Sequence, residues 1–512
     1  MRNTPKRSKT ALIKLLALFA ALTMVAAACG SDAADLADAA GDVADEVEDA
    51  VTDDEDEEAM EDEDEEAMED EDEEAMEDED EEAMEDDEDV TLTVAIVGNP
   101  QLEDIQELTP EFFTGPSGIN VEFVVLDEGT LREVTTRDVA AGGDQFDVVQ
   151  IGMFETPQFG AAGFIQSLQG FAEADDSYDI DDILPAVRGG LSVDGELFAA
   201  PFYAESSFIM YRADVLEEAG QTMPNAPTWD EVAAIARAID TDERAGICLR
   251  GLAGWGDLGA SFTTVLNTFG GTWWLDGGDT IGEAQFDQPE AAEAFNFYVD
   301  LINDAGQDDA ANSSFNQCLA LYQNDEVAMW YDATVAASIL EAPDSPVVGL
   351  NDYALAPQGP AGIPSGWLWS WTLAIPSSNT DLVEEAWEFI SWATGPEYLT
   401  LVGEEIAWVE APPGTRTSLY ENPNYTEAAA AFADITLEAM NAAQVDNPGV
   451  DPRPGLPGVQ FVGVPQFQDA GNQCTAQLGS AIGGGQSVDD ALSACQAILE
   501  GFTGQTFEAS AS

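Results

Sequence analysis

The chain has 512 residues, no histidine and a formal net charge of −88 at pH 7, from 102 acidic and 14 basic residues. Without histidine, a Ser-His-Asp or Cys-His nucleophile and a histidine metal site are excluded, and so acidic a chain is a very poor partner for nucleic acid. Every lysine lies in the first 29 residues, so Schiff-base chemistry and a Walker-type lysine are excluded from the remainder.

The first segment has the order of a secretory signal. Basic residues precede the apolar run LLALFAALTMVAAAC, which ends in small residues at Cys29 and is short for a membrane span. The segment resembles a bacterial lipoprotein signal, in which 1–28 is removed and Cys29 carries the lipid. Ordinary cleavage and free secretion is the alternative, because Ala26 stands where leucine is usual. We expect an exported protein, at the cell surface or in the periplasm, anchored to the membrane through Cys29.

Residues 29–89 are dominated by the acidic repeat EEAMEDED, and 30–89 alone carry a charge of −37. The segment has no aromatic residue and few large apolar ones, so it cannot bury enough surface to offset the entropy of ordering. Methionines eight residues apart would spiral around a helix and form no apolar stripe. We interpret the repeat as a disordered, self-repelling tether. Cation binding by its carboxylates is the alternative, although the spacing of a calcium loop is absent.

The composition changes at Val90, where strand and helix patterns begin to alternate. VTLTVAIV, INVEFVVLD and FDVVQIG are β-branched and apolar, and QLEDIQELTPEFF and TLREVTTRDVAAG between them have helical spacing. This alternation predicts an α/β fold with a mostly parallel sheet. The segment 90–512 is too long for one core, so we expect two lobes. Its charge of −56 indicates a hydrated surface adapted to salt.

Four cysteines follow Cys29, and an even number in an exported chain predicts disulfides. Cys474 and Cys495 flank a segment that reads as helix, glycine turn and helix, which would bring them together. Cys248 and Cys318 then remain as the second pair. No C-x-x-C motif is present, and we expect no metal site.

Aromatic residues cluster beside carboxylates at three places. Trp255 precedes Asp257, Trp330 and Tyr331 precede Asp332, and GWLWSWTLAIP spaces its tryptophans by two. In a strand, alternate positions share one face, so these tryptophans form an aromatic platform. Such a platform next to carboxylates suits a polyhydroxy ligand, because rings cover C–H surface and a carboxylate accepts hydroxyl hydrogens. Packing in the core is the alternative for each tryptophan.

Several longer stretches carry a resemblance to a known family. FDVVQIGMFETPQFGAAGFIQSL, NDEVAMWYDATVAAS and TDLVEEAWEFISWATGPEYL occur in the order found in extracellular solute-binding proteins (family 1) of ABC sugar importers. WGDLGASFTTVLNTFGGTWW, GWLWSWTLAIP, APPGTRTSLYENP and GVQFVGVPQFQ are similar to the sorbitol/mannitol-binding subgroup. The resemblance covers essentially all of 90–512.

The resemblance implies a periplasmic-binding-protein-like fold, with two α/β lobes, a hinge and a ligand cleft between the lobes. It places the crossings near Pro201–Glu205 and Ala354–Pro357. The first lobe would then be about 90–202 and 357–400, and the second about 203–356 and 401–512. Ligand would stabilise the closed state because it contacts both lobes only there.

Family position and local chemistry together give the candidate ligand-binding residues. The tryptophans Trp255, Trp367 and Trp369 would wall the ligand, and Asp332 and Glu205 would accept hydroxyl hydrogen bonds. Arg250 would either donate to the ligand or pair with Asp332. Tyr203 and Glu155 at probable strand ends, and Arg416 in a loop that would cover the cleft, complete the set.

We expect a monomer without cofactor or catalytic residues. It would deliver a polyol such as sorbitol or mannitol, or a sugar, to the permease subunits of an ABC importer. A mono- or oligosaccharide is the alternative ligand. The rival class is a secreted glycan-active enzyme, which would use two carboxyl groups about 5–10 Å apart.

Overall fold

A computed structural model describes residues 90–443 and 458–507. The chain divides into two units, 1–85 and 86–512, and the described residues all belong to the second unit. The expected signal, Cys29 and the acidic repeat lie outside the described residues. Within them, no helix is long and apolar enough to cross a membrane.

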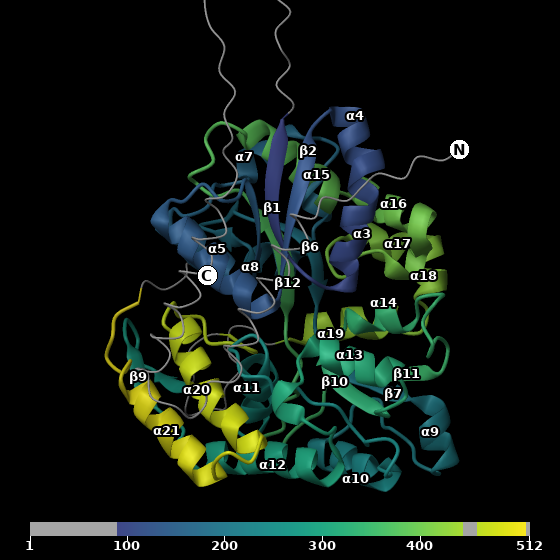
Figure 1. Ribbon diagram of the computed structural model, residues 1–512, viewed down its shortest axis with the longest axis vertical. Coiled ribbons are helices and arrows are strands. Elements are labelled where there is room, and N and C mark those ends of the chain that lie inside the picture. The colour runs from purple at the N-terminus through teal and green to yellow at the C-terminus, as the bar shows by residue number, and fades with distance from the viewer. Residues whose placement is uncertain (1–89, 444–457, 508–512) are drawn as a thin grey trace, which may run out of the picture. The chain divides into compact units, whose positions relative to one another are not determined.

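The first lobe is built on a five-stranded sheet in the order β2-β1-β3-β12-β6 (Figure 1). The expected strands near 90–97, 119–127 and 146–152 are confirmed, and they are the first three strands along the chain. The strands of this sheet are β1 (Thr91–Val97), β2 (Asn120–Leu126), β3 (Val148–Gly152), β6 (Ala200–Glu205) and β12 (Trp369–Ala374).

Four of the five strands of this sheet run in one direction, so the expected mostly parallel order is confirmed for it, and β12 is the exception. β1 pairs in parallel with β2 and β3, whereas β12 is antiparallel to both β3 and β6. The physical reason is the path of the chain. β6 carries it out of the first lobe and β12 carries it back, so these neighbouring strands run in opposite directions.

The second lobe contains a three-stranded antiparallel sheet in the order β10-β7-β11. Two short hairpins lie outside both sheets. The remaining strands are β7 (Ser207–Arg212), β10 (Met329–Ala333), β11 (Asn351–Leu355), β4 (Ser192–Val193), β5 (Glu196–Leu197), β8 (Trp274–Asp276) and β9 (Ile281–Ala284).

Helices cover both sheets. Around the first sheet lie α3 (Pro100–Thr109), α4 (Gly115–Ser117), α5 (Glu128–Ala141), α6 (Glu155–Ala162), α7 (Gln169–Ala174), α8 (Pro185–Gly190), α15 (Val383–Thr394), α16 (Pro396–Val402), α17 (Thr417–Glu421) and α18 (Pro423–Ala428). Associated with the second lobe are α9 (Ala213–Glu218), α10 (Trp229–Ile239), α11 (Leu258–Thr268), α12 (Pro289–Ala305), α13 (Phe315–Gln323), α14 (Ala336–Leu340), α19 (Ala433–Ala442), α20 (Phe467–Ile482) and α21 (Val488–Glu500).

Short helical turns complete the described elements. They are the π-helical turns η1 (Pro110–Thr114) and η4 (Gly403–Ala407) and the 3₁₀ turns η2 (Ile180–Asp182), η3 (Ala310–Asn312) and η5 (Trp408–Glu410).

The connections between the lobes show where the chain crosses. β6 pairs with β12 as far as Glu205, so the chain leaves the first sheet beyond the expected boundary at 202, and β7 of the second sheet follows at Ser207. The backbone N–H of Ala204 donates to Pro413 O at 2.9 Å, and that of Leu184 donates to Thr415 O at 2.9 Å. This part of the expected second lobe therefore lies against the first.

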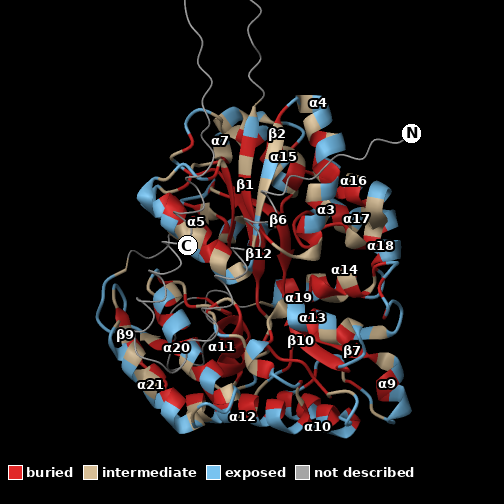
Figure 2. Ribbon diagram, viewed as in Figure 1, coloured by how far each residue is buried: buried red, intermediate tan, exposed pale blue. Residues whose placement is uncertain are grey.

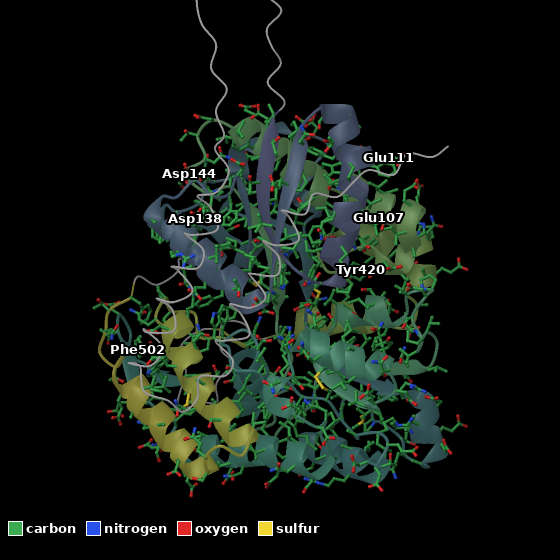
Figure 3. All side chains as sticks on the ribbon, in the orientation of Figure 1. Glu107, Glu111, Asp138, Asp144, Tyr420 and Phe502 are labelled. Atoms are coloured by element: carbon green, nitrogen blue, oxygen red, sulfur yellow. A yellow bond between two sulfur atoms is a disulfide. The ribbon has the colours of Figure 1, made fainter. Side chains whose placement is uncertain are left out.

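The strands of the first sheet are the most deeply buried part of the core, and exposed residues lie mainly on the outer sides of helices (Figure 2). Every residue of β3, β6 and β12 is buried, which is typical of strands covered on both faces. Acidic side chains such as Glu107, Glu111 and Asp144 point outward (Figure 3). This placement explains how so acidic a chain still has an apolar interior.

Both expected disulfides are confirmed. Cys248 is bonded to Cys318 and Cys474 to Cys495. The second bond joins α20 to α21, the helix pair expected from the glycine turn at 483–485.

Candidate ligand-binding site

A cavity of about 280 Å³ lies between the two lobes. The first lobe contributes the ends of β1 and β2 with Tyr203, Glu205 and Trp371, and the second contributes Arg250, Asp257 and the start of α13. The volume is near the lower end of small-molecule pockets, which span roughly 300–1,000 Å³. The space therefore suits one small molecule that contacts both lobes.

Four helix N-termini meet at this cavity. The residues preceding α3, α5, α11 and α13 are Asn99, Asp127, Asp257 and Ser314, and all four line it. The Asn99 side chain accepts from the backbone N–H of Leu102, and Asp127 accepts from that of Thr130. Helix N-termini present positive partial charge, so they favour electron-rich oxygens in the space between them.

Arg250 and Asp332 form a buried pair beside the cavity. Nε of Arg250 donates to Oδ2 of Asp332 at 2.9 Å and Nη2 donates to Oδ1 at 2.6 Å. Asp332 also accepts from Trp330 Nε1 at 3.0 Å and from the backbone N–H of Ala333 at 2.7 Å, and it is fully buried. Burial alone would lower the pKa of Arg250, but the carboxylates of Asp332, Glu128 and Asp257 together outweigh it and raise that pKa.

Arg250 and Asp332 were both candidate ligand-binding residues, but only Arg250 lines the cavity. Of the alternatives open for Arg250, the structure shows the ion pair with Asp332, and Arg250 also lines the cavity. Asp332 lies behind Arg250 and is not among the residues that line the cavity. Its geometry therefore fits positioning of Arg250 better than direct acceptance from a ligand hydroxyl.

Arg132 lies within a group of three tryptophans. Its Cζ atom is 4.1 Å from the ring centroid of Trp255, 4.6 Å from that of Trp371 and 4.9 Å from that of Trp369. The guanidinium also binds two carboxylates, Glu128 at 3.0 Å and Glu155 at 2.5 Å. Since Trp255 comes from the second lobe and the other members come from the first, the group joins the lobes by cation–π contacts.

Trp255, Trp367 and Trp369 come together around a smaller space of about 40 Å³, which Glu128, Glu205 and Arg250 also line. All three tryptophans are at most 6 % exposed. The ring nitrogens of Trp255 and Trp367 have no hydrogen-bond partner among the described residues. These tryptophans thus pack in the interior beside the cavity, and the role of walling a ligand stays a prediction for each of them.

Glu205 and Tyr203 line the main cavity from β6. The Tyr203 hydroxyl accepts from Asn99 Nδ2 at 3.0 Å, and burial raises its pKa. Burial raises the pKa of Glu205 well above its ordinary range. Across the cavity, burial raises the pKa of Asp257 to about 7, with the Glu128 carboxylate adding to the effect.

Two other candidate residues lie elsewhere. Glu155 accepts from the backbone N–H of Gly152 at 3.0 Å and binds Arg132, so it lies beneath the tryptophans, away from the main cavity. Arg416 is fully buried in the first lobe, where it donates to the carbonyl oxygens of Thr394 and Tyr178 at 3.0 and 2.7 Å. It does not line the cavity, and its loop is held to the lobe by this arginine.

Several cavity residues were not anticipated from the sequence. They are Asn99, Asp127, Glu128, Ser314, Asn316 and Gln317, with Arg132 behind them. A local signal for most was present, because Asn, Asp or Ser precedes a helix pattern at each place and Ser314 with Gln317 has the spacing of a capping box. Among the described residues, no group of side chains has the arrangement of a metal site.

Comparisons with known proteins show the family to which the chain belongs. Residues 99–400 match the family described as bacterial extracellular solute-binding protein. The chain belongs to this family. The predicted family and the two-lobed α/β fold are therefore confirmed, and this solute-binding protein is exported, in the periplasm or at the cell surface.

Two relatives cover most of the solute-binding protein. It is 38 % identical over 409 residues to a mannitol-binding protein of Pseudomonas aeruginosa, which covers 79 % of this chain and 91 % of that one. It is 46 % identical to an ABC transporter solute-binding protein of Agrobacterium vitis S4, solved with bound D-mannitol. That alignment has a TM-score of 0.77 and covers 80 % of this chain and 97 % of the other. A maltose-bound Thermotoga maritima protein, 22 % identical with a TM-score of 0.66, shares the fold.

Proposed function

We propose that this protein captures a neutral polyol of the mannitol or sorbitol class in the cavity between its lobes and delivers it to the permease of an ABC importer. The observation that carries the proposal is the cavity itself, a small space lined from both lobes by carboxylate, amide, hydroxyl and guanidinium groups. A polyol hydroxyl both donates and accepts, and these groups offer both kinds of partner. The D-mannitol in the 46 % identical relative supports this ligand class.

Capture would follow from closure of the lobes on the ligand. Asn316 of the second lobe donates to Gly98 O of the first at 3.1 Å, and Gln101 donates to Ser338 Oγ at 3.0 Å, so the lobes already touch at the rim. A ligand that contacts both lobes stabilises this closed arrangement in proportion to its preference for it. Transport then needs no bond to be broken, and the protein would act without catalysis and without a cofactor.

The membrane attachment and the N-terminal segment belong to the same proposal. Cys29 would carry the lipid, and the acidic repeat would hold the binding unit, acting as a monomer, away from the membrane. Deleting 30–89 from the soluble protein should leave ligand affinity unchanged. A large loss of affinity would contradict the tether role.

A thermal-shift screen of residues 90–512 in high salt tests the function. A ligand that binds only the native state raises Tm by mass action. We expect a rise with D-mannitol or sorbitol and none with glucose. A rise only with mono- or oligosaccharides would move the ligand to sugars. No rise with any of them, together with breakdown of a glycan, would point to an enzyme.

A further inference from the structure

Among the residues that the structure describes, Glu205 has a carboxyl group without a partner, and this group lines the ligand cavity. It stands at the last position of β6, it is 6 % exposed, and it lines both the main cavity and the smaller space beside it. Its Oε2 atom is buried and has no hydrogen bond, and no ion pair of Glu205 occurs within 90–443 and 458–507. A buried carboxylate in this position is costly unless it is paired or protonated.

The two arginines near Glu205 are already engaged. Arg250 holds Asp332 through two of its nitrogens, and Arg132 holds Glu128 and Glu155. Neither guanidinium is within ion-pair distance of Glu205 in the described structure. The carboxyl groups in and around the cavity therefore outnumber the cations. Among the described residues, Glu205 pairs with neither arginine.

The surroundings of Glu205 are mostly acidic on every side. The titratable and charged groups around it are Tyr203 on its own strand, Glu128 and Arg132 on α5, Arg250 and Asp257 in the segment before α11, and Asp332 on β10. Asp127, Glu128 and Asp257 also occupy the N-terminal ends of α5 and α11, so the positive ends of these helices face carboxylates of their own.

We propose that Glu205 binds the ligand as its neutral carboxylic acid, so that closure around a polyol takes up one proton from solvent. The acid O–H would donate to a ligand hydroxyl oxygen, and its carbonyl oxygen would accept from a second hydroxyl. This inference rests on the proposed function and adds to it a proton-linked affinity and a reason for selecting uncharged ligands, because an anionic sugar acid would meet the neighbouring carboxylates.

The sign of the linkage follows from the closed structure. Burial raises the pKa of Glu205, Arg250 opposes the rise, and Asp332 and Glu128 reinforce it. In an open, hydrated cleft the same group returns toward its ordinary pKa. Closure is then favoured at low pH, and ligand affinity falls as the pH rises above the ordinary carboxyl pKa, by at most tenfold per pH unit for one proton.

The test is isothermal titration calorimetry of residues 90–512 with D-mannitol between pH 5.5 and 8.5. We expect the wild-type Kd to rise by about tenfold or more across this range. In E205Q, a neutral amide replaces the acid. The Kd of this variant should change by less than about threefold between pH 5.5 and 8.5, and it should bind more tightly than the wild type at pH 8.5. D104N is the matched control, because burial likewise raises the pKa of Asp104 to about 7 but Asp104 does not line the cavity, so this variant should keep the wild-type pH dependence.

A second measurement needs no variant. Titrations of the wild type at pH 8 in two buffers of different ionisation enthalpy should show net uptake of a proton on binding. A wild-type Kd that does not rise with pH, proton release on binding, or a pH dependence that D104N loses and E205Q retains would each overturn the inference. Failure of D-mannitol to bind at every pH would overturn the proposed function and this inference together.

Discussion

Gly152 offers a sharp test of how the tryptophans support the ligand site. It lies at the end of β3, opposite Trp371 of β12. A Cβ added there would fall 1.9 Å from Cζ2 and 2.2 Å from Cη2 of the Trp369 ring. Since carbon atoms in contact are separated by about 3.5–4.0 Å, Gly152→Ala must displace the ring by roughly 1.5 Å or more.

The displaced ring has little free space. Trp255, Trp371 and Phe461 lie 5.6–6.2 Å from it by ring centroids. The nearest space is the 40 Å³ pocket that it shares with Trp255 and Trp367. Overpacking of this kind costs about 1–3 kcal/mol. If the whole cost falls on the ligand-bound form, Kd for D-mannitol rises about 5- to 150-fold.

Titration calorimetry with D-mannitol, together with a thermal melt, measures the effect of G152A. Gly170→Ala is the control, because an added Cβ on α7 meets nothing within 4 Å, and it should leave Kd unchanged without lowering Tm. A G152A protein that keeps both wild-type Kd and Tm would refute the role assigned to the Trp369 ring.

Three further predictions concern stability. Asp332→Asn should lower the free energy of unfolding by about 3–5 kcal/mol in urea, because it leaves the buried Arg250 guanidinium without its counter-ion; a loss below about 1 kcal/mol would contradict this. Replacing Cys474 and Cys495 by serine should cost about 3 kcal/mol, given their separation of 21 residues, and reduction of the variant should then lower Tm less than reduction of the wild type. Burial raises the pKa of Asp104 to about 7, so its protonated form stabilises the fold and this stability is lost as pH rises from about 4 to 7. D104N should therefore raise Tm at pH 8 and not at pH 3.5, and equal melting of both proteins at pH 8 would count against it.

Local sequence signals predicted the elements that depend on nearby residues. The strands and helices from 90 to 152, the helix pair around 474–495 and the platform of alternating tryptophans all follow from periodicity over a short window. The expectation of mostly parallel order did not foresee the reversed strand β12, because this strand comes from far along the chain. Periodicity carries no information about that return.

The site was harder to predict for the same reason. Arg250 and Asp332 are 82 residues apart, and the Arg132 group assembles α5, the Trp255 segment and β12. Family position and local chemistry marked Arg250 as a candidate, but no spacing links Arg132 to the tryptophans. Arg416 was misplaced because a loop position near the end of the chain says little about depth, and its side chain proved to bind main-chain oxygens in the interior.

The position of Trp255 also gives the protein a built-in optical signal. Its indole faces the Arg132 cation and the ring of Phe154, 4.6 Å away by centroids, and both partners belong to the other lobe. Opening of the lobes would transfer this indole from a dry, cationic setting into water. The emission wavelength of Trp255 should therefore follow closure directly, and rapid mixing could time ligand capture in the unlabelled protein.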